Sequence, residues 1–219
     1  MTKLSLLFKK EWTLNLKPAS YIYIYSVLSL LILIPEYPYF VSFAYCLIGI
    51  PTLFSYLKGN KDLEFNAMLP LSRTEIVKSK ILCVTFIQGL QIATAIPCAL
   101  VSALVLNPAG NLVGLDANFT LFAFALLGYS IFNLLFLPNF FGTGYKVAKP
   151  TVFAFIGYLG FTLIAECLVM FVPTLHTIFD GYAYLGAQLI LLGVAIVAYA
   201  VNIYLTYKLS VKRFEKVNL

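Results

Sequence analysis

The stretch KGNKDLEFNAMLPLSRTEIVKSK, residues Lys58–Lys80, is the longest run of polar and charged sequence in a chain of 219 residues that is 61% hydrophobic. Only 11% of the residues are charged, whereas about a quarter are charged in an ordinary soluble domain. The stretch therefore interrupts a chain that has the composition of a polytopic membrane protein. Because no polar or Gly/Ser-rich linker divides the hydrophobic blocks, we expect residues 1–219 to form a single membrane domain.

The hydrophobic blocks on either side of this stretch are long enough to cross a membrane. A helix needs about 20 apolar residues to span a hydrocarbon core about 30 Å thick, so the sequence predicts an all-α fold with six transmembrane helices. The predicted spans are Ala19–Ile34, Tyr39–Leu57, Ile81–Leu106, Asn118–Pro138, Thr151–Val172 and Ala183–Tyr207. Pro51 and Pro97 lie inside the second and third spans and favour kinks there, because each removes a backbone hydrogen bond.

The distribution of positive charge predicts the orientation. All 15 Lys and Arg residues lie before the first span, in 58–80, in 139–150 or in the tail, whereas 35–38, 107–117 and 173–182 contain none. Positively charged loops stay on the cytoplasmic side, which predicts a plasma-membrane protein with both termini inside the cell. The net charge of +6 is dispersed between spans, so we expect a lipid bilayer and no nucleic acid as its acidic partner.

Residues 1–17 have the pattern of an amphipathic helix at the membrane surface. Lys3, Lys10 and Lys17 are seven residues apart and therefore share one stripe of a helix, which we expect to face lipid headgroups. Glu11 intrudes on the apolar side of this helix. Two interpretations remain open: a surface anchor alone, or a helix that also touches a cytoplasmic partner.

The polar stretch itself contains two helix signals in series. Asp62 is predicted to cap a short helix that runs to about Leu69, because Pro70 disfavours helical geometry in the residue before it. Ser72 and Glu75 then form a capping box, which predicts the start of a second helix that continues into the third span without a break. A short helix, a rigid corner and a long helix in series would act as a lever.

The short helix also carries apolar side chains next to charged ones. It contains four apolar residues beside three polar ones: Leu63, Phe65, Met68 and Leu69 beside Asp62, Glu64 and Asn66. Exposed apolar groups on a cytoplasmic loop favour a protein partner. The alternative is that these side chains fold back onto the inner leaflet.

The segments MLPLSR (68–73) and IVKSK (76–80) lie between the second and third of six spans and follow an interfacial N-terminal helix. In this pattern the chain resembles permease subunits of ABC-2 type ABC transporters, especially the small bacterial exporters of phenol-soluble modulins and antimicrobial peptides. The resemblance implies a coupling helix that sits in a cytoplasmic ABC ATPase subunit. It also implies two permease chains, as a homodimer or heterodimer, and two ATPase chains that bind ATP and Mg.

The resemblance assigns roles to individual residues of this stretch. Contact with the ATPase is implied for Asp62, Leu63, Glu64, Phe65, Met68, Leu69, Pro70, Leu71 and Arg73. The capping pattern of the residues themselves assigns Ser72 and Glu75 as the caps that hold the corner.

Catalytic motifs are not found in the sequence. Nothing matches GxxxxGK[ST], HExxH or GxSxG, and the single histidine, His176, falls in a predicted external loop. The four cysteines, Cys46, Cys83, Cys98 and Cys167, lie in or beside apolar runs without a CxxC pair. We therefore expect a chain that is not an enzyme, has no metal site and holds no cofactor of its own.

Three polar residues fall inside predicted spans. An ionisable residue in a span is a functional candidate by default, so Glu166 either lines a central cavity or lies near the outer interface and bonds to a neighbouring helix. Gln88 and Gln91, three residues apart on one helix face, are interhelical hydrogen-bonding groups or substrate ligands.

Together these patterns favour the transmembrane subunit of an ATP-driven exporter of hydrophobic or amphipathic substrates, including peptides. The export direction and the peptide cargo rest on the resemblance alone. Two alternatives are a membrane immunity or scaffold protein that does not transport, and an ion-coupled carrier.

Overall fold

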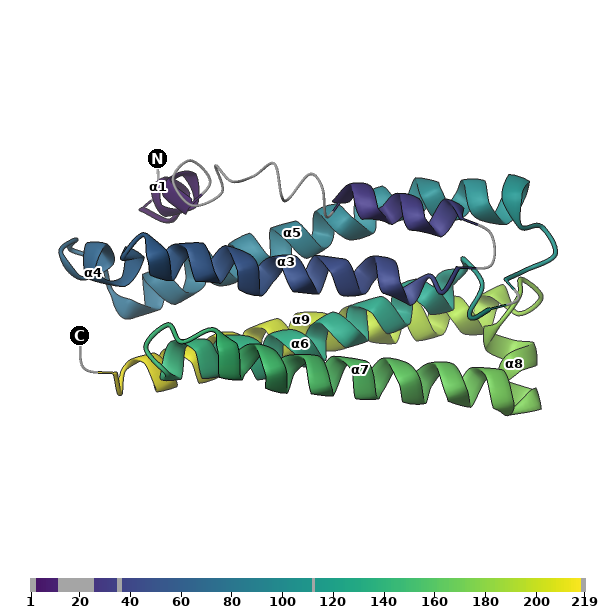
Figure 1. Cartoon of the computed structure of the whole chain (residues 1–219). Helices are drawn as coiled ribbons and strands as arrows, with labels where there is room; N and C mark the ends of the chain where they lie inside the picture. Colours follow the sequence, from purple (N-terminus) through teal and green to yellow (C-terminus); the bar gives the residue numbers. More distant parts are fainter. Residues whose placement is uncertain (1–2, 12–25, 35–36, 112, 218–219) are drawn as a thin grey trace.

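The computed structural model describes residues 3–11, 26–34, 37–111 and 113–217. Every regular element within these ranges is a helix, and the long helices run roughly side by side along one axis (Figure 1). The predicted all-α fold is thus confirmed.

Five helices within the described residues are long and apolar enough to cross a membrane. They are α3 (Phe40–Gly59), α5 (Arg73–Val101, continued by the π-helix η3, Ser102–Leu106), α6 (Phe119–Gly142), α7 (Ala148–Phe171) and α9 (Leu185–Phe214). These five correspond to the second to sixth predicted spans. Of the predicted first span, residues 19–25 lie outside the described residues and the remainder includes the short 3-10 helix η2 (Leu28–Leu33). The first predicted span, and with it the total of six spans, therefore stays a prediction.

Several helix ends differ from the sequence prediction. Helix α6 does not stop at Pro138 but continues to Gly142, because a transmembrane helix tolerates a proline where neighbouring groups satisfy the freed backbone atoms. Helix α9 continues past Tyr207 to Phe214, so basic residues that were expected in a tail belong to a helix. A short helix that the sequence did not predict, α8 (Pro173–Phe179), follows α7.

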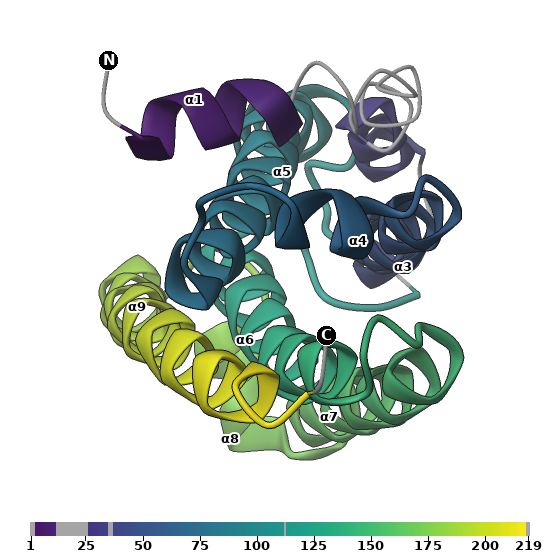
Figure 2. The ribbon, with the colours of Figure 1, turned by 90° about the vertical axis from the view of Figure 1, so that its left-hand side faces the viewer.

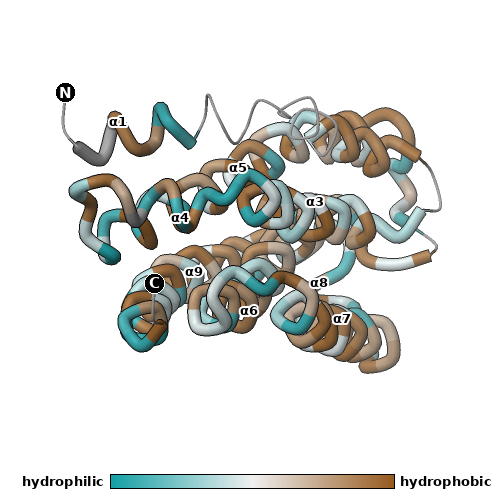
Figure 3. The backbone as a smooth tube through the Cα atoms, turned by 60° about the vertical axis from the view of Figure 1, so that its left-hand side comes forward, coloured by the Kyte–Doolittle hydropathy of each residue, from teal (hydrophilic) through white to brown (hydrophobic). Residues whose placement is uncertain are grey.

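The two ends of the bundle differ in composition. Helix α1 (Lys3–Lys10), helix α4 (Asp62–Ala67) and the end of α9 lie at one end, and α8 lies at the other (Figure 1). The tube coloured by hydropathy shows hydrophilic residues gathered at the α4 end and hydrophobic ones along the long helices (Figure 3). The segments that carry the positive charges thus meet at one end, in agreement with the charge pattern that predicts a cytoplasmic side.

Aromatic packing holds the half of the bundle nearest α4. Phe132, Phe136 and Phe140 follow one another along α6, and the ring of Phe54 from α3 packs edge-on, its centroid 5.4 Å from that of Phe136 and 4.6 Å from that of Phe140. Such contacts add about 0.5–1.5 kcal/mol each beyond their burial. They fix α3 against α6 close to the point where α4 begins.

Gly128 sets the approach of α6 to α7. A methyl group at this position would lie 2.7 Å from an edge carbon of the buried Tyr158 ring, whereas one at Gly160 would meet no atom within 4 Å. We expect Gly128→Ala to lower the free energy of unfolding by about 1–3 kcal/mol relative to Gly160→Ala, because the added methyl overpacks the interface. Thermal unfolding of both variants in the same detergent measures the difference. Equal midpoints would contradict this packing.

Candidate functional site

The chain turns sharply between α3 and α4. Lys61 adopts a left-handed conformation (φ 51°) and is the N-cap residue of α4, and its side chain makes no capping hydrogen bond. The prediction that Asp62 caps the short helix is therefore wrong. The carboxylate of Asp62 is directed into the protein instead, because two ammonium groups bind it there.

The start of α5 is capped as the sequence predicted. The Glu75 backbone N–H donates to Ser72 Oγ at 3.2 Å, and the Ser72 backbone N–H donates to Glu75 Oε2 at 2.9 Å. This reciprocal pair satisfies two backbone donors that a helix start otherwise leaves open. The capping box and the uninterrupted passage of this helix into the third span are confirmed.

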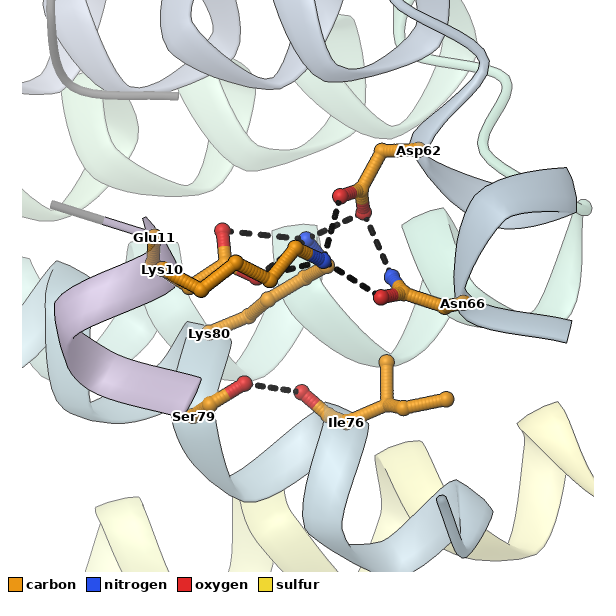
Figure 4. Close-up of polar contacts among 7 residues, drawn as sticks. All are labelled: Lys10, Glu11, Asp62, Asn66, Ile76, Ser79 and Lys80. Carbon is orange, nitrogen blue, oxygen red and sulfur yellow. Dashed lines mark hydrogen bonds and ion pairs between the residues drawn. The ribbon is translucent and has the colours of Figure 1, made fainter. Parts of the chain in front are cut away.

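A buried ion cluster joins α1, α4 and α5 at the hydrophilic end of the bundle (Figure 4). Lys80 Nζ of α5 lies 2.7 Å from Asp62 Oδ2 and 3.3 Å from Glu11 Oε1. Lys10 Nζ lies 3.0 Å from Asp62 Oδ1 and also donates to Asn66 Oδ1, while Asn66 Nδ2 donates to Asp62 Oδ2 at 2.8 Å. We call these five residues, Lys10, Glu11, Asp62, Asn66 and Lys80, the ion cluster.

The charges of the ion cluster balance, two positive and two negative, and they are shielded from water. Lys80 is 1% exposed and Asp62 is 4% exposed. Burial by itself raises the pKa of Asp62, but the charges and hydrogen bonds of Lys80 and then Lys10 outweigh it and hold that pKa below its ordinary value. Removing one partner of such a buried pair costs about 3–5 kcal/mol, because it leaves the other charge without compensation.

The ion cluster also changes the interpretation of the N-terminal helix. Lys10 does not face lipid headgroups as predicted; its side chain turns inward to Asp62, and Glu11 reaches Lys80. Helix α1 packs on α5, where the Phe8 and Phe86 rings meet edge to face with centroids 6.0 Å apart (Figure 2). Residues 12–17 of the predicted amphipathic helix lie outside the described residues.

The opposite face of α4 and its following turn carry apolar side chains at the surface. Phe65 is 47% exposed and Met68 is 82% exposed, and Glu64 and Pro70 are exposed beside them. Leu69 is half-buried, whereas Leu63 and Leu71 pack against the core. The buried side of α4 thus holds the polar Asp62 and Asn66 together with Leu63, whereas Phe65 is exposed, an unusual place for a large apolar side chain on a surface helix.

Arg73 occupies a different position from the other residues of the stretch. Its guanidinium donates to the backbone carbonyls of Phe214 at 2.7 Å and Glu215 at 2.8 Å, and it lies over the Phe214 ring at 5.5 Å from the centroid. A cation at the C-terminus of a helix stabilises the last carbonyls. Arg73 therefore joins the start of α5 to the end of α9.

Gln88 and Gln91 form hydrogen bonds between helices. Gln88 exchanges two hydrogen bonds with Asn133 of α6, at 3.0 and 2.8 Å, and accepts a third from Tyr199 of α9 at 2.7 Å. Gln91 Nε2 donates to Ser29 Oγ of η2 at 3.0 Å. Gln88 therefore connects α5 to α6 and α9, whereas Gln91 connects α5 to η2.

Glu166 lies near the far end of the bundle from the ion cluster, on α7. A methyl group on Gly114 would collide with its carboxylate, and the Leu115 backbone supplies it with a hydrogen bond. Of the two alternatives for Glu166, the geometry agrees with a place near an end of the bundle, and the partner is loop 107–118 rather than a neighbouring helix.

Asp116 ties the segments at that far end together. Its Oδ2 accepts from the Gly181 backbone N–H at 2.9 Å, and its own N–H donates to Asp180 Oδ1 at 3.0 Å. Burial raises the pKa of Asp116. His176 lies 3.4 Å from Asp180 within the same region, so the single histidine belongs to this loop network.

Four members of the ion cluster were not predicted as site residues: Lys10, Glu11, Asn66 and Lys80. A signal existed for two of them, Asn66 and Glu11. Asp62 and Asn66 are four residues apart and so share a helix face, and Glu11 lies on the apolar side of its helix. No local signal indicated Lys80, because its partners come from distant parts of the chain.

The comparison with protein-family models agrees with this architecture. Residues 6–214 match the family described as ABC-2 family transporter protein. The chain therefore belongs to the ABC-2 transporter family and is a membrane component of a transporter, consistent with the permease subunit of an ABC transporter. A search of curated proteins and a search of solved structures gave no significant match.

The ion cluster predicts an asymmetry between two neighbouring lysines of α5. We expect Lys80→Ala to lower the free energy of unfolding by about 3–5 kcal/mol, because Asp62 and Glu11 lose a buried counter-charge. Lys78→Ala, which removes an exposed side chain, should leave it unchanged. Thermal unfolding in detergent compares the variants, and equal effects at both positions would contradict the buried pairing.

The lowered pKa of Asp62 predicts a pH dependence. A carboxyl whose folded pKa is depressed stabilises the fold above its unfolded pKa of about 3.9, and this contribution disappears as pH falls through the folded value. The midpoint difference between wild type and Asp62→Asn should therefore be constant above about pH 5 and shrink below about pH 4. Unfolding scans across this range measure it. A difference that grows on acidification would contradict the assignment.

Proposed function

We propose that the chain is the permease subunit of an ATP-driven exporter, and that α4 is the helix that docks on a cytoplasmic ABC ATPase subunit. The observation that carries this proposal is the exposure of Phe65 in α4 and of Met68 directly after it, on the side opposite the buried Asp62 and Asn66. Because the polar face is used within the protein, the apolar face is available to a partner, and exposed apolar groups of this kind mark interaction sites.

The position of α4 supports a cytoplasmic partner. It lies with α1 and the end of α9 at the end of the bundle where the positively charged segments meet (Figure 1). Under the positive-inside rule this end faces the cytoplasm. We infer six spans, with both termini inside the cell and the chain in the plasma membrane.

The remaining parts of the transporter are supplied by other chains. The sequence contains no phosphate-binding GxxxxGK[ST] motif, so ATP and Mg would bind the partner and hydrolysis would occur there. Family membership supports an ABC transporter with an ATPase partner. We infer a second permease chain, identical or related, beside this one.

The interior supports hydrophobic or amphipathic cargo, including peptides. A cavity of about 500 Å³ lies between α5, α6 and α9 towards the far end, and aliphatic side chains such as Ile92, Leu104 and Ile196 line it. Its size falls within the usual range of small-molecule sites. The carboxylate of Glu166 accepts a hydrogen bond near the outer loops. This arrangement does not support the alternative function, an ion-coupled carrier.

Affinity purification of the solubilised chain from its native cells tests the proposal. Wild type should copurify with a stoichiometric ATP-binding subunit. Phe65→Asp and Met68→Asp should each lose it, because a charge in the apolar contact must be desolvated on docking. Val113→Asp, which changes a half-exposed apolar residue at the far end, is the matched control and should retain it.

Two outcomes would contradict the proposal. Retention of the ATP-binding subunit by both α4 variants would place its contact elsewhere. Purification of wild type without any such subunit would favour a scaffold or immunity protein that does not transport.

A further inference from the structure

Helices α4 and α5 are connected in two ways, through the chain and through the ion cluster. The chain connection consists of residues 68–72, which are not helical. The second connection is the ion pair between Asp62 in the first turn of α4 and Lys80 in α5. Which of the two transmits a displacement of α4 depends on which is stiffer.

The chain connection is exposed and its hydrogen bonds are local. Leu69 N–H donates to the Asn66 carbonyl at 3.3 Å, Leu71 N–H donates to the Leu69 carbonyl at 2.7 Å, and Met68 between them is 82% exposed. A segment with few buried contacts and exposed backbone bonds opens at low free-energy cost. Leu71 packs against the core and Ser72 is fixed by the capping box, so these two residues belong to the rigid start of α5. Residues 68–70 are therefore a compliant link, and the corner that was predicted to be rigid is stiff only at its α5 end.

The ion pair has the opposite properties. Lys80 lies seven residues beyond Arg73, about two turns along α5, and its ammonium is 2.7 Å from Asp62 in a place that water does not reach. Ion pairs act more strongly where the surroundings exclude water. Separating α4 from α5 would leave both charges buried and uncompensated, so the two helices are held together at this point.

We propose that Lys80 is a positioning residue of the transporter: through Asp62 it makes α4 and α5 move as one body, so that displacement of α4 enters the membrane through this ion pair rather than through residues 68–72. The proposal rests on the proposed function, in which an ATPase displaces α4. It assigns the transmission of movement to a contact between residues 18 positions apart.

The ion cluster itself supplies a matched control. Lys10 and Glu11 form their own ion pair at 3.7 Å, and both belong to the N-terminal segment. Removing the Asp62 and Lys80 charges leaves Lys10 with Glu11, and removing the Lys10 and Glu11 charges leaves Asp62 with Lys80. Both double variants therefore keep a balanced cluster, and only one of them breaks the link between α4 and α5.

The experiment compares these double variants in the intact complex with the copurified ATPase, reconstituted into lipid nanodiscs. Spin labels are placed at Val105→Cys and Ile164→Cys, two exposed positions on η3 and α7, after the four native cysteines are replaced by alanine. Double electron–electron resonance measures the distance between the labels, first without nucleotide and then with ATP and vanadate. ATP hydrolysis and subunit stoichiometry are measured on the same samples.

We expect wild type and Lys10→Met/Glu11→Gln to show a shift of the distance distribution with ATP and vanadate. Asp62→Asn/Lys80→Met should lose the shift while it keeps the ATPase subunit and ATP hydrolysis, a separation that a merely structural role for Lys80 would not produce. A full shift in Asp62→Asn/Lys80→Met would overturn the proposal in favour of residues 68–72.

If the double variant does not assemble with the ATPase, a single variant provides a second test. Asp62→Asn preserves the shape of the side chain and weakens the pair, and it should reduce the fraction of molecules that shift; an undiminished shift would overturn the proposal. A wild-type complex that holds the ATPase but shows no shift would also overturn it. Absence of any ATPase from the wild-type preparation would instead count against the proposed function.

Discussion

A buried ammonium group requires a counter-charge, and at Lys80 this requirement organises one end of the molecule. Because water does not reach the side chain, its charge must be balanced by protein groups. Asp62 and Glu11 supply the balance from two other segments of the chain. The positions of α1 and α4 against α5 follow from this one electrostatic condition.

The same condition accounts for the unusual polarity of α4. Asp62 and Asn66, one turn apart, are directed inward to satisfy the lysines. Leu63 also packs inward, whereas Phe65 of this six-residue helix is directed outward. Phe65 is held there partly by Lys10, whose ammonium lies 5.1 Å from the ring centroid. An exposed apolar side chain thus lies over buried polar groups.

Much of the fold could be predicted because its determinants are local in sequence. Apolar blocks of about 20 residues predict transmembrane helices by length alone, and five of them correspond to long helices of the structure. The Ser72–Glu75 capping box was predicted for the same reason, since both partners lie within one turn. The predicted span ended at Pro138, whereas α6 continues to Gly142, because a helix in a membrane bundle can extend through a proline.

The contacts of the candidate site could not be predicted, because they join distant parts of the chain. Asp62 binds Lys80, 18 residues away, and Lys10, 52 residues away. Its type and position also suited an N-cap, and local sequence offered no means to choose between the two roles. Only the folded arrangement shows that tertiary charge pairing prevails over local capping.

The contact of Arg73 with the last carbonyls of α9 has a consequence for the tail of the chain. It connects residues 141 positions apart, so the beginning of α5 and the final turn of the last helix form one corner. A fusion partner or tag that unwinds the backbone at Phe214 would withdraw the acceptors of this guanidinium. A change in the backbone at Phe214 would then alter the start of α5, although α5 begins 141 residues earlier in the sequence.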